Sequence, residues 1–334
     1  MFIWGMIKSI SAPDSFLISR IIFTIVALAL AGPATLGCAG SPKAKTGVFA
    51  VYGPAVSGDL RASGSLVLMT DFGLADGAVS AMKGVARDTA PAVHVSDLTH
   101  EIPPYNIWEA AYRLEQTYRY WPKGTVFVSV IDPGVGSERK SIAALSKSGH
   151  IFVGPDNGLM TFIDDVDGIE SVVAIDESKQ RLKGSEESYT FHGRDLYVYV
   201  GARLAGGFTS LDALGTKQVG VVKLPYQKTE FVKGEILSTI PVLDPNYGNV
   251  WSEISKKVFD QHFSGAKKVR VRIPKARYDQ VLPVASTFSA VPKGKALVYF
   301  NSLMNLSVAL NQGDFARFHK VKSGPDWKII ISLE

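Results

Sequence analysis

Short apolar runs alternate with helix-like segments from about residue 65 to residue 205. The apolar runs predict β-strands and the longer segments predict helices. The predicted strands are 66–70, 92–98, 125–132, 151–153 and 171–175, and the predicted helices are 79–88, 107–120 and 196–204. This alternation is typical of an α/β fold with a mostly parallel sheet flanked by helices. We therefore predict an α/β N-terminal domain over residues 65–221.

The pattern changes after this domain. Extended runs at 235–242, 268–273, 296–300 and 328–333 are separated by Pro and Gly. Short strands punctuated by turn residues are typical of all-β structure. We predict a smaller, β-rich C-terminal domain over residues 222–334.

The first 64 residues differ from both predicted domains. Lys8 and Arg20 precede an apolar run at 21–31, which small residues follow. This order is typical of an export signal, which we assign to residues 1–38. The run is shorter than the roughly 20 residues that a membrane-spanning helix needs, and an uncleaved membrane anchor is the alternative. Residues 39–64 are mostly Gly, Ser, Ala, Pro and Lys, and we predict a flexible tether there.

Cys38 is the only cysteine of the chain, so it cannot form an intramolecular disulfide. The segment Thr35-Leu36-Gly37-Cys38 resembles a bacterial lipobox, although Thr35 stands where Leu is usual. We therefore expect an exported protein that is periplasmic or anchored to the membrane as a lipoprotein through Cys38. A buried or incidental thiol is the alternative.

Composition narrows the class of protein only slightly. The chain has 46% hydrophobic and 20% charged residues, which is ordinary for a folded protein. Its formal net charge of +5 is mild for this length, and its Lys and Arg residues are scattered among Asp and Glu. Composition therefore argues against nucleic acid as a partner.

Polar residues beside Gly or Pro follow several predicted strands. Asp71, Asp97 and Asp132 each close an apolar run. In an open α/β sheet ligands bind beyond the carboxyl ends of the strands, so we expect these carboxylates to share one edge. Carboxylates and histidines there are also competent ligands for a divalent metal, as in a phosphohydrolase. No His pair at HxH or HxxxH spacing supports a metal site.

Five segments in the predicted loops carry recognisable motifs: TDFG at 70–73, DLTHE at 97–101, DPGVG at 132–136, GPDNG at 154–158 and FHGRD at 191–195. In this order they resemble the adenosine-forming S-adenosylmethionine (SAM) hydrolases, also called SAM hydroxide adenosyltransferases. That family is related to the SAM-dependent fluorinase and chlorinase. The resemblance extends from residue 66 to about residue 315 and implies cleavage of SAM to adenosine and L-methionine without a cofactor or metal.

The resemblance also implies three catalytic residues. In the hydrolases an Asp, an Arg and a His hold the attacking water, and the matching residues here are Asp132, Arg139 and His192. The halogenating relatives carry Tyr at the position of Asp132, so this chain resembles the branch that uses water. Asp132 and His192 are both able to accept a proton, and which of them does so stays open. Without the resemblance, Asp132 and Arg139 would be read as a loop ion pair and His192 as a helix-capping residue.

Two substrate contacts are implied in the first domain. Asp71 resembles the carboxylate that binds both ribose hydroxyls, and an Asx turn before Gly73 is its plain structural alternative. Tyr105 stands where relatives place an aromatic residue along the ribose. An ordinary core position is the alternative for Tyr105.

Five further contacts are implied in the second domain. Asp244 resembles the residue that binds the methionine ammonium group, Asn249 the one that binds the adenine edge, and Tyr247 an aromatic residue stacked on the base or an ordinary core residue. Ser302 resembles a contact to the methionine carboxylate, and Asn311 lies on the adenine side. The apolar Leu-Met pair after Ser302 departs from the small or polar residues common in the family.

The family resemblance implies a homotrimer in which each substrate lies between the first domain of one subunit and the second domain of its neighbour. A different class of function stays open on the same fold: an exported SAM- or nucleoside-binding lipoprotein with little catalysis. A metal-dependent hydrolase and a structural envelope protein also stay open. Turnover of SAM, dependence on metal and binding of SAM separate these four functions.

Overall fold

The computed structural model describes residues 55–334. The predicted export signal, Cys38 and the first part of the predicted tether lie outside the described residues. In the described part of the chain, no helix has the length and apolar character needed to span a membrane.

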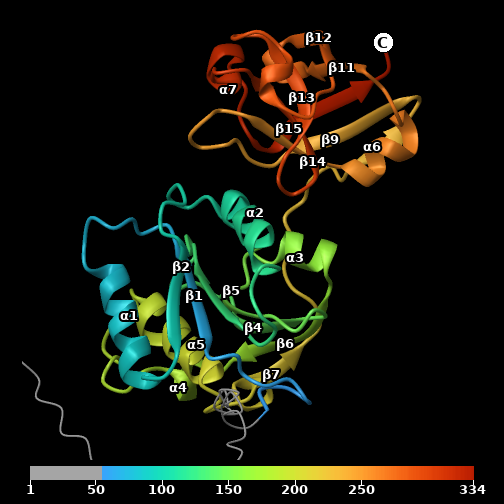
Figure 1. The fold of residues 1–334 in the computed structure, drawn as a ribbon. Coiled ribbons are helices and arrows are strands. Elements are labelled where there is room, and N and C mark those ends of the chain that lie inside the picture. Colours follow the sequence, from blue (N-terminus) through green and yellow to red (C-terminus); the bar gives the residue numbers. More distant parts are fainter. Residues whose placement is uncertain (1–54) are drawn as a thin grey trace, which may run out of the picture. The chain divides into compact units, whose positions relative to one another are not determined.

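A seven-stranded sheet organises the N-terminal domain, in the order β2-β1-β3-β5-β4-β6-β7 (Figure 1). Neighbours β2, β1, β3 and β5 run parallel, whereas β4 is antiparallel to both β5 and β6. Two reversals restore the direction, so β6 runs the same way as β3. The strands are β1 (Ser65–Thr70), β2 (His94–Thr99), β3 (Val126–Val130), β4 (Ser141–Ser146), β5 (Ile151–Pro155), β6 (Ile169–Ile175) and β7 (Gly215–Gln218).

Helices cover both faces of this sheet (Figure 1). Leu66 and Leu68 pack with α1 and α5 on one face, and Val67 and Met69 pack with α2 and α3 on the other. Because successive strand residues point to opposite faces, a sheet covered on both faces needs continuous apolar runs. The helices are α1 (Ala78–Thr89), α2 (Ile107–Tyr118), α3 (Thr161–Val166), α4 (Glu177–Gln180) and α5 (Val198–Ala205). The predicted α/β fold with a mostly parallel sheet is confirmed.

The sequence pattern did not reveal strand β4 and the reversal of direction that it introduces. β4 reads SIAALS, and its small residues carry little strand signal. The fold also begins upstream of Ser65. The prediction placed residues 55–64 in a flexible tether, but Val56 is fully buried in the core and its carbonyl accepts a hydrogen bond from the Leu211 N–H at 2.8 Å.

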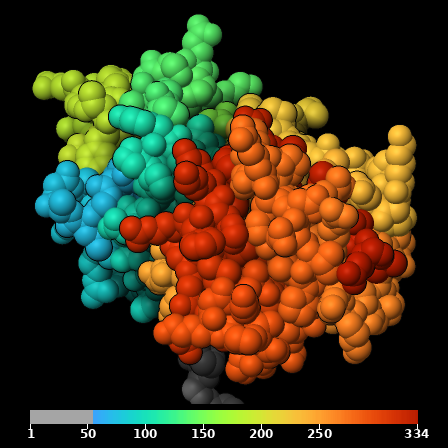
Figure 2. Space-filling model, turned by 90° about the horizontal axis from the view of Figure 1, so that it is seen from above, coloured from blue at the N-terminus to red at the C-terminus, as the bar shows by residue number. Residues whose placement is uncertain are grey.

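The C-terminal domain contains two antiparallel sheets, ordered β12-β11-β15-β9-β8 and β10-β14-β13. The strands are β8 (Glu230–Val232), β9 (Glu235–Ile240), β10 (Val250–Ser255), β11 (Lys268–Ile273), β12 (Tyr278–Pro283), β13 (Ala296–Phe300), β14 (Asn305–Leu310) and β15 (Gly324–Ser332). Two short helices that were not predicted, α6 (Lys256–Phe263) and α7 (Phe315–His319), accompany them. In the space-filling view the segments from β11 to the C-terminus, coloured orange to red, form one continuous surface (Figure 2).

Helix α2 contacts the chain just after β9. The Trp108 Nε1–H donates a hydrogen bond to the Pro241 carbonyl at 2.8 Å, and Arg113 donates one to the Leu243 carbonyl at 3.1 Å. Trp108, Tyr112 and Val242 are buried in one apolar cluster there. These contacts pack α2 against the chain segment that follows β9.

Candidate active site

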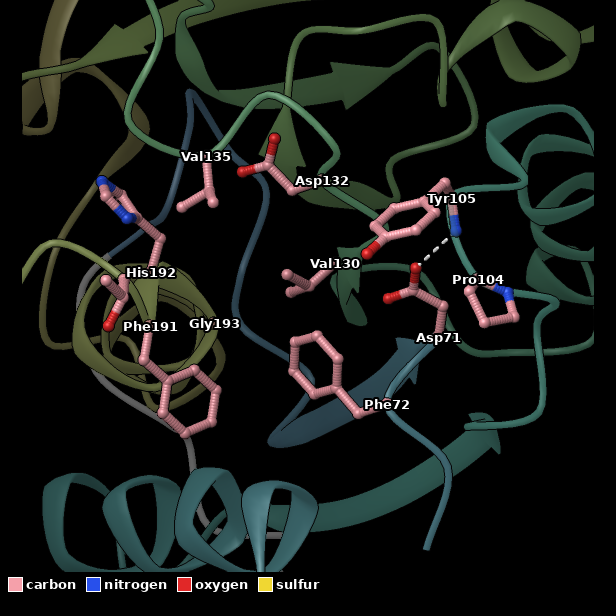
Figure 3. Close-up of a pocket in the computed structure, with 11 residues that line it drawn as sticks. Asp71, Phe72, Pro104, Tyr105, Val130, Asp132, Val135, Phe191, His192 and Gly193 are labelled. Atoms are coloured by element: carbon pink, nitrogen blue, oxygen red, sulfur yellow. Dashed lines mark hydrogen bonds between the residues drawn. The ribbon is translucent and has the colours of Figure 1, made fainter. Parts of the chain in front are cut away.

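A cavity of about 370 Å³ lies in the α/β domain beyond the carboxyl ends of β1 and β3. It brings together four residues singled out from the sequence: Asp71, Tyr105, Asp132 and His192. In Figure 3, Asp71 and Tyr105 lie on one side, His192 lies on the opposite side, and Asp132 lies between them. The rest of the lining is mostly apolar and consists of Phe72, Pro104, Val130, Val135, Thr190, Phe191 and Gly193.

Asp97 is not part of this cavity, contrary to the expectation that three carboxylates share the edge. It lies inside β2, two residues before the strand ends. Its carboxylate instead contacts the Lys83 ammonium group at 2.6 Å and the His100 ring at 3.0 Å. Strand pairing continues past Asp97 to Thr99, so an Asp at the end of an apolar run does not always mark the end of a strand.

Asp132 and Arg139 form a nearly buried ion pair. The Arg139 Nε–H lies 3.1 and 3.0 Å from the two Asp132 carboxylate oxygens, and the Nη2 group donates to Oδ2 at 2.6 Å. The Arg139 side chain is 10% exposed and the Asp132 side chain is 6% exposed. The turn that returns Arg139 to Asp132 contains Gly136, which has a left-handed backbone with φ of 79°. An ion pair within the loop was the structural alternative for Asp132 and Arg139. Because this pair is nearly buried, breaking it costs more free energy than breaking an exposed pair.

Glu177 joins the ion pair to His192, and sequence reasoning did not identify it. Its Oε2 lies 3.0 Å from the His192 Nε2, and its Oε1 accepts a hydrogen bond from the Ser141 hydroxyl at 2.6 Å. The Arg139 Nη1 lies 3.4 Å from the same Oε1. Asp132, Arg139, Glu177 and His192 thus form one continuous polar network behind the cavity.

The signal for Glu177 was present but incomplete. It follows β6 by two residues, so it stands after an apolar run as Asp71 and Asp132 do. Only the two direction reversals at β4 bring the carboxyl end of β6 to the edge that carries Asp132. Nothing in the local pattern shows those reversals.

The network sets the charge of its members. The hydrogen bond from His192 is the main reason that the pKa of Glu177 is lowered to about 2, against the opposing effect of burial. Burial alone would lower the pKa of Arg139, but the hydrogen bond and charge of Asp132 raise it above its ordinary value. Burial raises the pKa of Tyr197, whose hydroxyl lies 2.9 Å from the Ser141 hydroxyl. The site therefore holds an ionised Glu177 and a charged Arg139 next to a neutral phenol.

His192 is held in place by its neighbours in the chain. It is 3% exposed and directly precedes the π-helical turn Gly193–Tyr197. Such turns are frequent at functional sites. A side chain at Gly193 would come within 3.3 Å of the rings of Phe72 and Phe191. His192 makes no side-chain capping hydrogen bond, so the capping interpretation of this residue does not hold.

Asp71 and Tyr105 are linked through the backbone. The Tyr105 N–H donates a hydrogen bond to Asp71 Oδ2 at 2.8 Å, drawn as a dashed line in Figure 3. Tyr105 has a positive φ of 65°, which is unusual for a bulky residue. Tyr105 is 71% exposed, so it is not a core residue, and its ring lies beside the Asp71 carboxylate.

The five candidate residues of the C-terminal domain line other cavities. Tyr247, Asn249 and Asn311 line one of about 440 Å³. Ser302 lines another beside Glu253, and Asp244 lines a third. Tyr247 is 67% exposed and is therefore not a core residue. Within this chain, the described C-terminal residues contribute nothing to the cavity of Asp132 and His192.

Two of the C-terminal candidates already form hydrogen bonds within the chain. The Asn311 amide nitrogen already donates to the Val291 carbonyl at 2.8 Å. Asp244 Oδ1 accepts the N–H groups of Asn246 and Tyr247, both at 3.0 Å, and so shapes the turn that presents Tyr247. Among the described residues, no group of three or more His, Cys, Asp or Glu side chains is arranged to hold a metal ion.

A parallel-stranded α/β domain with a charged network at its carboxyl edge, followed by an antiparallel β domain, defines a two-domain protein that binds a small polar ligand at that edge. The family model of the SAM hydroxide adenosyltransferase N-terminal domain matches residues 66–215, and that of the C-terminal domain matches residues 238–328. The chain belongs to the SAM hydroxide adenosyltransferase family. The resemblance stated from the motifs is confirmed.

Individual relatives agree with this assignment. A (R)-S-adenosyl-L-methionine hydrolase from Thermus thermophilus is 33% identical over 267 residues, which cover 77% of this chain and 95% of that protein. A fluorinase from an Actinoplanes species is 25% identical over 285 residues, which cover 78% and 95%. The crystal structure of an uncharacterized conserved protein from Thermotoga maritima matches with a TM-score of 0.74 and 30% identity, covering 80% of this chain and 99% of that one.

Proposed function

We propose that this protein hydrolyses SAM to adenosine and L-methionine. One observation carries the proposal: a single turn holds Asp132 and Arg139, and a network through Glu177 joins this turn to the distant His192 at a cavity that also contains Asp71. Membership of the family and the name of the Thermus relative support the same substrate. The greater identity to that hydrolase than to the fluorinase, together with Asp at position 132, supports water as the nucleophile.

The chemistry requires positioning more than activation. A water oxygen forms a bond to the ribose C5′ while the C5′–S bond breaks and its electron pair stays on sulfur as the methionine thioether. One water proton remains on the new 5′-hydroxyl of adenosine, and the other leaves through a protein base. The sulfonium is already a good leaving group, so the main barrier is to aim one oxygen at carbon in a site with little bulk water.

The cavity suits that task. Asp71 offers a carboxylate to the two ribose hydroxyls, and the exposed Tyr105 ring borders the same space. Val130, Val135 and Phe191 line the cavity with apolar surface, which leaves few groups that could hold additional water. Asp132, Arg139 and His192 are the catalytic residues of this proposal.

The decisive experiment uses purified protein, SAM and water enriched in oxygen-18. Chromatography is expected to show adenosine and methionine in equal amounts, and mass spectrometry is expected to find the heavy oxygen in adenosine. Label in adenosine places the attack at C5′. SAM that binds but returns unaltered favours a binding lipoprotein, and loss of activity with a chelator favours a metal-dependent hydrolase.

His192→Ala separates catalysis from binding. Because His192 faces the attacking oxygen in this proposal and not the ribose or methionine grips, the variant should lose about 100-fold or more in kcat with a small change in SAM affinity. Calorimetry measures the affinity and a chromatographic assay measures kcat. Equal losses in both would contradict the role of His192.

We also propose that the active protein is a homotrimer with its sites between subunits. The family resemblance implies this arrangement. It is supported by the separation within one chain of the Asp132 cavity from the cavity of Tyr247, Asn249 and Asn311. In the trimer those residues, with Asp244 and Ser302, contact the adenine and methionine parts of a substrate held by a neighbour.

Mixing two inactive variants tests shared sites. Asp132→Asn and Asn249→Ala are unfolded together, refolded together and assayed, with each variant refolded alone as the control. If the two residues come from different subunits, random assembly restores about a quarter of the wild-type sites. If both act within one chain, the mixture stays as inactive as its components. Light scattering independently gives the mass of the assembly.

We propose, finally, that the protein is exported and anchored through a lipid on Cys38. The order of charge, apolar run, small residues and cysteine in the first 38 residues supports this location. When cells that express the full chain are grown with radiolabelled palmitate, the wild-type protein should carry the label and Cys38→Ala should not. Wild-type protein without the label would contradict the lipid anchor.

A further inference from the structure

Glu177 is the one member of the charged network to which neither the motifs nor the family resemblance assigns a role. Each of its carboxylate oxygens has a different partner. Oε2 lies 3.0 Å from the His192 Nε2, and Oε1 accepts the Ser141 hydroxyl at 2.6 Å and lies 3.4 Å from the Arg139 Nη1. Its position is therefore determined from three sides.

The contact with His192 determines which ring nitrogen carries hydrogen. Glu177 is ionised over the whole neutral range, since its pKa is lowered to about 2, and an ionised carboxylate only accepts hydrogen bonds. The His192 Nε2 must therefore be the N–H donor. The Nδ1 atom is buried and has no hydrogen-bond partner among the described residues. This leaves Nδ1 as the basic atom of a ring that lines the cavity.

Asp132 is less suited to accept the proton. Its two oxygens are occupied by three hydrogen bonds from Arg139. Protonation of Asp132 would break the ion pair and leave a nearly buried guanidinium group without its main partner, which is costly. His192 is able to accept a proton at Nδ1 while Glu177 stabilises the imidazolium through Nε2, so nothing else in the network has to change.

We propose that Glu177 is the positioning residue of the site: it holds His192 in the Nε2–H form, so that Nδ1 accepts the proton of the attacking water. The same carboxylate steadies Arg139 through Ser141 and the direct contact. This inference rests on the proposed function for its catalytic part. The assignment of the ring nitrogens concerns the protein alone and does not depend on substrate.

The first experiment therefore needs no substrate. Nitrogen-15 spectra of histidine-labelled protein at pH 8 are compared for wild type, Glu177→Gln and the matched control Asp176→Asn, with His192→Gln used to assign the signal. Asp176 is adjacent in sequence but pairs with Lys179, not with His192. Wild type and Asp176→Asn should show hydrogen on Nε2 only, and Glu177→Gln should show a mixture of both forms. Hydrogen on Nδ1 in the wild type would overturn the inference, whatever the protein does to SAM.

The second experiment measures kcat, KM and the pH–rate profile with SAM. Glu177→Gln should lower kcat by about 10- to 100-fold, as loss of a carboxylate that orients a functional histidine commonly does, with KM changed less than about twofold. The charged groups around the ring are Glu177, Arg139 and Asp132, and the rings of Tyr189 and Tyr197 lie 6.4 and 6.2 Å from it. Of these only Glu177 bonds the ring directly.

Removing that charge should move the acidic limb of the profile to lower pH, because the imidazolium loses its stabilising carboxylate. Glu177→Asp, which keeps the charge, should restore part of kcat and the wild-type limb. An unchanged profile in Glu177→Gln with intact turnover would show that Glu177 is only structural. If the wild-type protein does not cleave SAM, the proposed function fails. The nitrogen-15 spectra still show which ring nitrogen of His192 carries hydrogen.

Discussion

Two partly buried glutamates, Glu177 and Glu253, have pKa values shifted in opposite directions. Glu177, at the carboxyl edge of the α/β sheet, contacts His192, Ser141 and Arg139, and its pKa is lowered to about 2. Glu253, on β10, borders the cavity of Tyr112 and Ser302, and burial followed by the charges of Glu115 and Asp165 raises its pKa to about 8. Within the described residues, the Glu253 carboxylate forms no ion pair or hydrogen bond.

Hydrogen-bonding and charged partners, not burial alone, decide whether these two carboxyl groups are ionised. Both side chains lose water, and this alone disfavours the charged form. At Glu177 the surrounding donors overcome that cost, so the charge is available for function. At Glu253 they do not, so the folded protein keeps this group neutral at pH 6 and loses stability as the pH rises from about 4.5 to about 8. The edge of the α/β sheet therefore stabilises the ionised form of Glu177, whereas the region around Glu253 disfavours the ionised form.

The strongest way to break the contrast is to remove the donor at the paired site. Arg139→Met leaves the nearly buried Asp132 carboxylate and the partly buried Glu177 carboxylate without a guanidinium. We expect about a 1,000-fold loss of kcat and a fall of about 3 kcal/mol in the free energy of unfolding, measured by turnover and by urea denaturation. Arg119→Met is the control, because that Arg is half exposed and its pair with Glu115 should contribute less than about 1 kcal/mol. Similar losses in both variants would contradict the contrast.

The next largest effect is expected at the unpaired site, with the opposite sign. Glu253→Gln removes a carboxyl group whose pKa is higher in the folded protein than in the unfolded chain. Wild type should therefore lose stability relative to the variant as pH rises from about 4.5 to about 8, with the full difference above pH 8. Thermal unfolding at pH 4.5 and pH 8.5 should show a gain for the variant on the order of 1–3 kcal/mol at the higher pH only. A difference that does not depend on pH would contradict the assignment.

Acid titration tests the paired carboxylate, Glu177. Because the pKa of Glu177 is lower in the folded protein, its stabilising effect is present above about pH 4.5 and disappears as pH falls through about 2. Wild type should lose on the order of 1–2 kcal/mol between pH 5 and pH 2 that Glu177→Gln does not lose. Chemical denaturation across this range measures the difference between the two curves. Parallel curves would show that Glu177 is not held ionised by the fold.

The smallest expected effect concerns the neighbour of Glu253. Burial raises the pKa of Glu115, and its contact with Arg119 at 3.2 Å opposes the shift. Glu115→Gln should lower the pKa of Glu253 in the folded protein, so that the loss of stability with rising pH levels off at a pH lower by less than about one unit, because one like charge is removed and Arg119 is freed. Thermal unfolding as a function of pH, with and without the substitution, checks this. A shift to higher pH would mean that the two carboxyl groups do not repel each other.

Much of the fold was predictable because its signals are local. Apolar runs of strand length, separated by helical segments, specified the α/β domain, and Pro- and Gly-separated extended runs specified the β domain. Strand β4 was missed because its SIAALS sequence has little strand preference. The start at Val56 was missed because a short apolar contact inside a polar segment leaves no periodic pattern.

The site was predictable only in part. The positions of Asp71 and Asp132 after parallel strands follow from sequence, since the carboxyl ends of such strands meet at one edge. Asp97 has the same local pattern but lies inside β2 with Lys83 and His100 as partners. Whether an Asp after an apolar run reaches the edge of the sheet depends on where strand pairing stops, and the sequence of one strand does not show this.

Local signals along the chain were enough to predict an α/β domain followed by a β domain, the strand ends that carry Asp71 and Asp132, and the family with its Asp, Arg and His. The folded arrangement was needed to see that Glu177 joins them and that the Glu253 carboxylate has no hydrogen-bond or ion-pair partner among residues 55–334. The physical reason is that strand formation depends on neighbours along the chain, whereas the charge of a carboxyl group depends on donors brought to it across space. Ser141 and His192 reach Glu177 from 36 and 15 residues away, and only the folded sheet places them there.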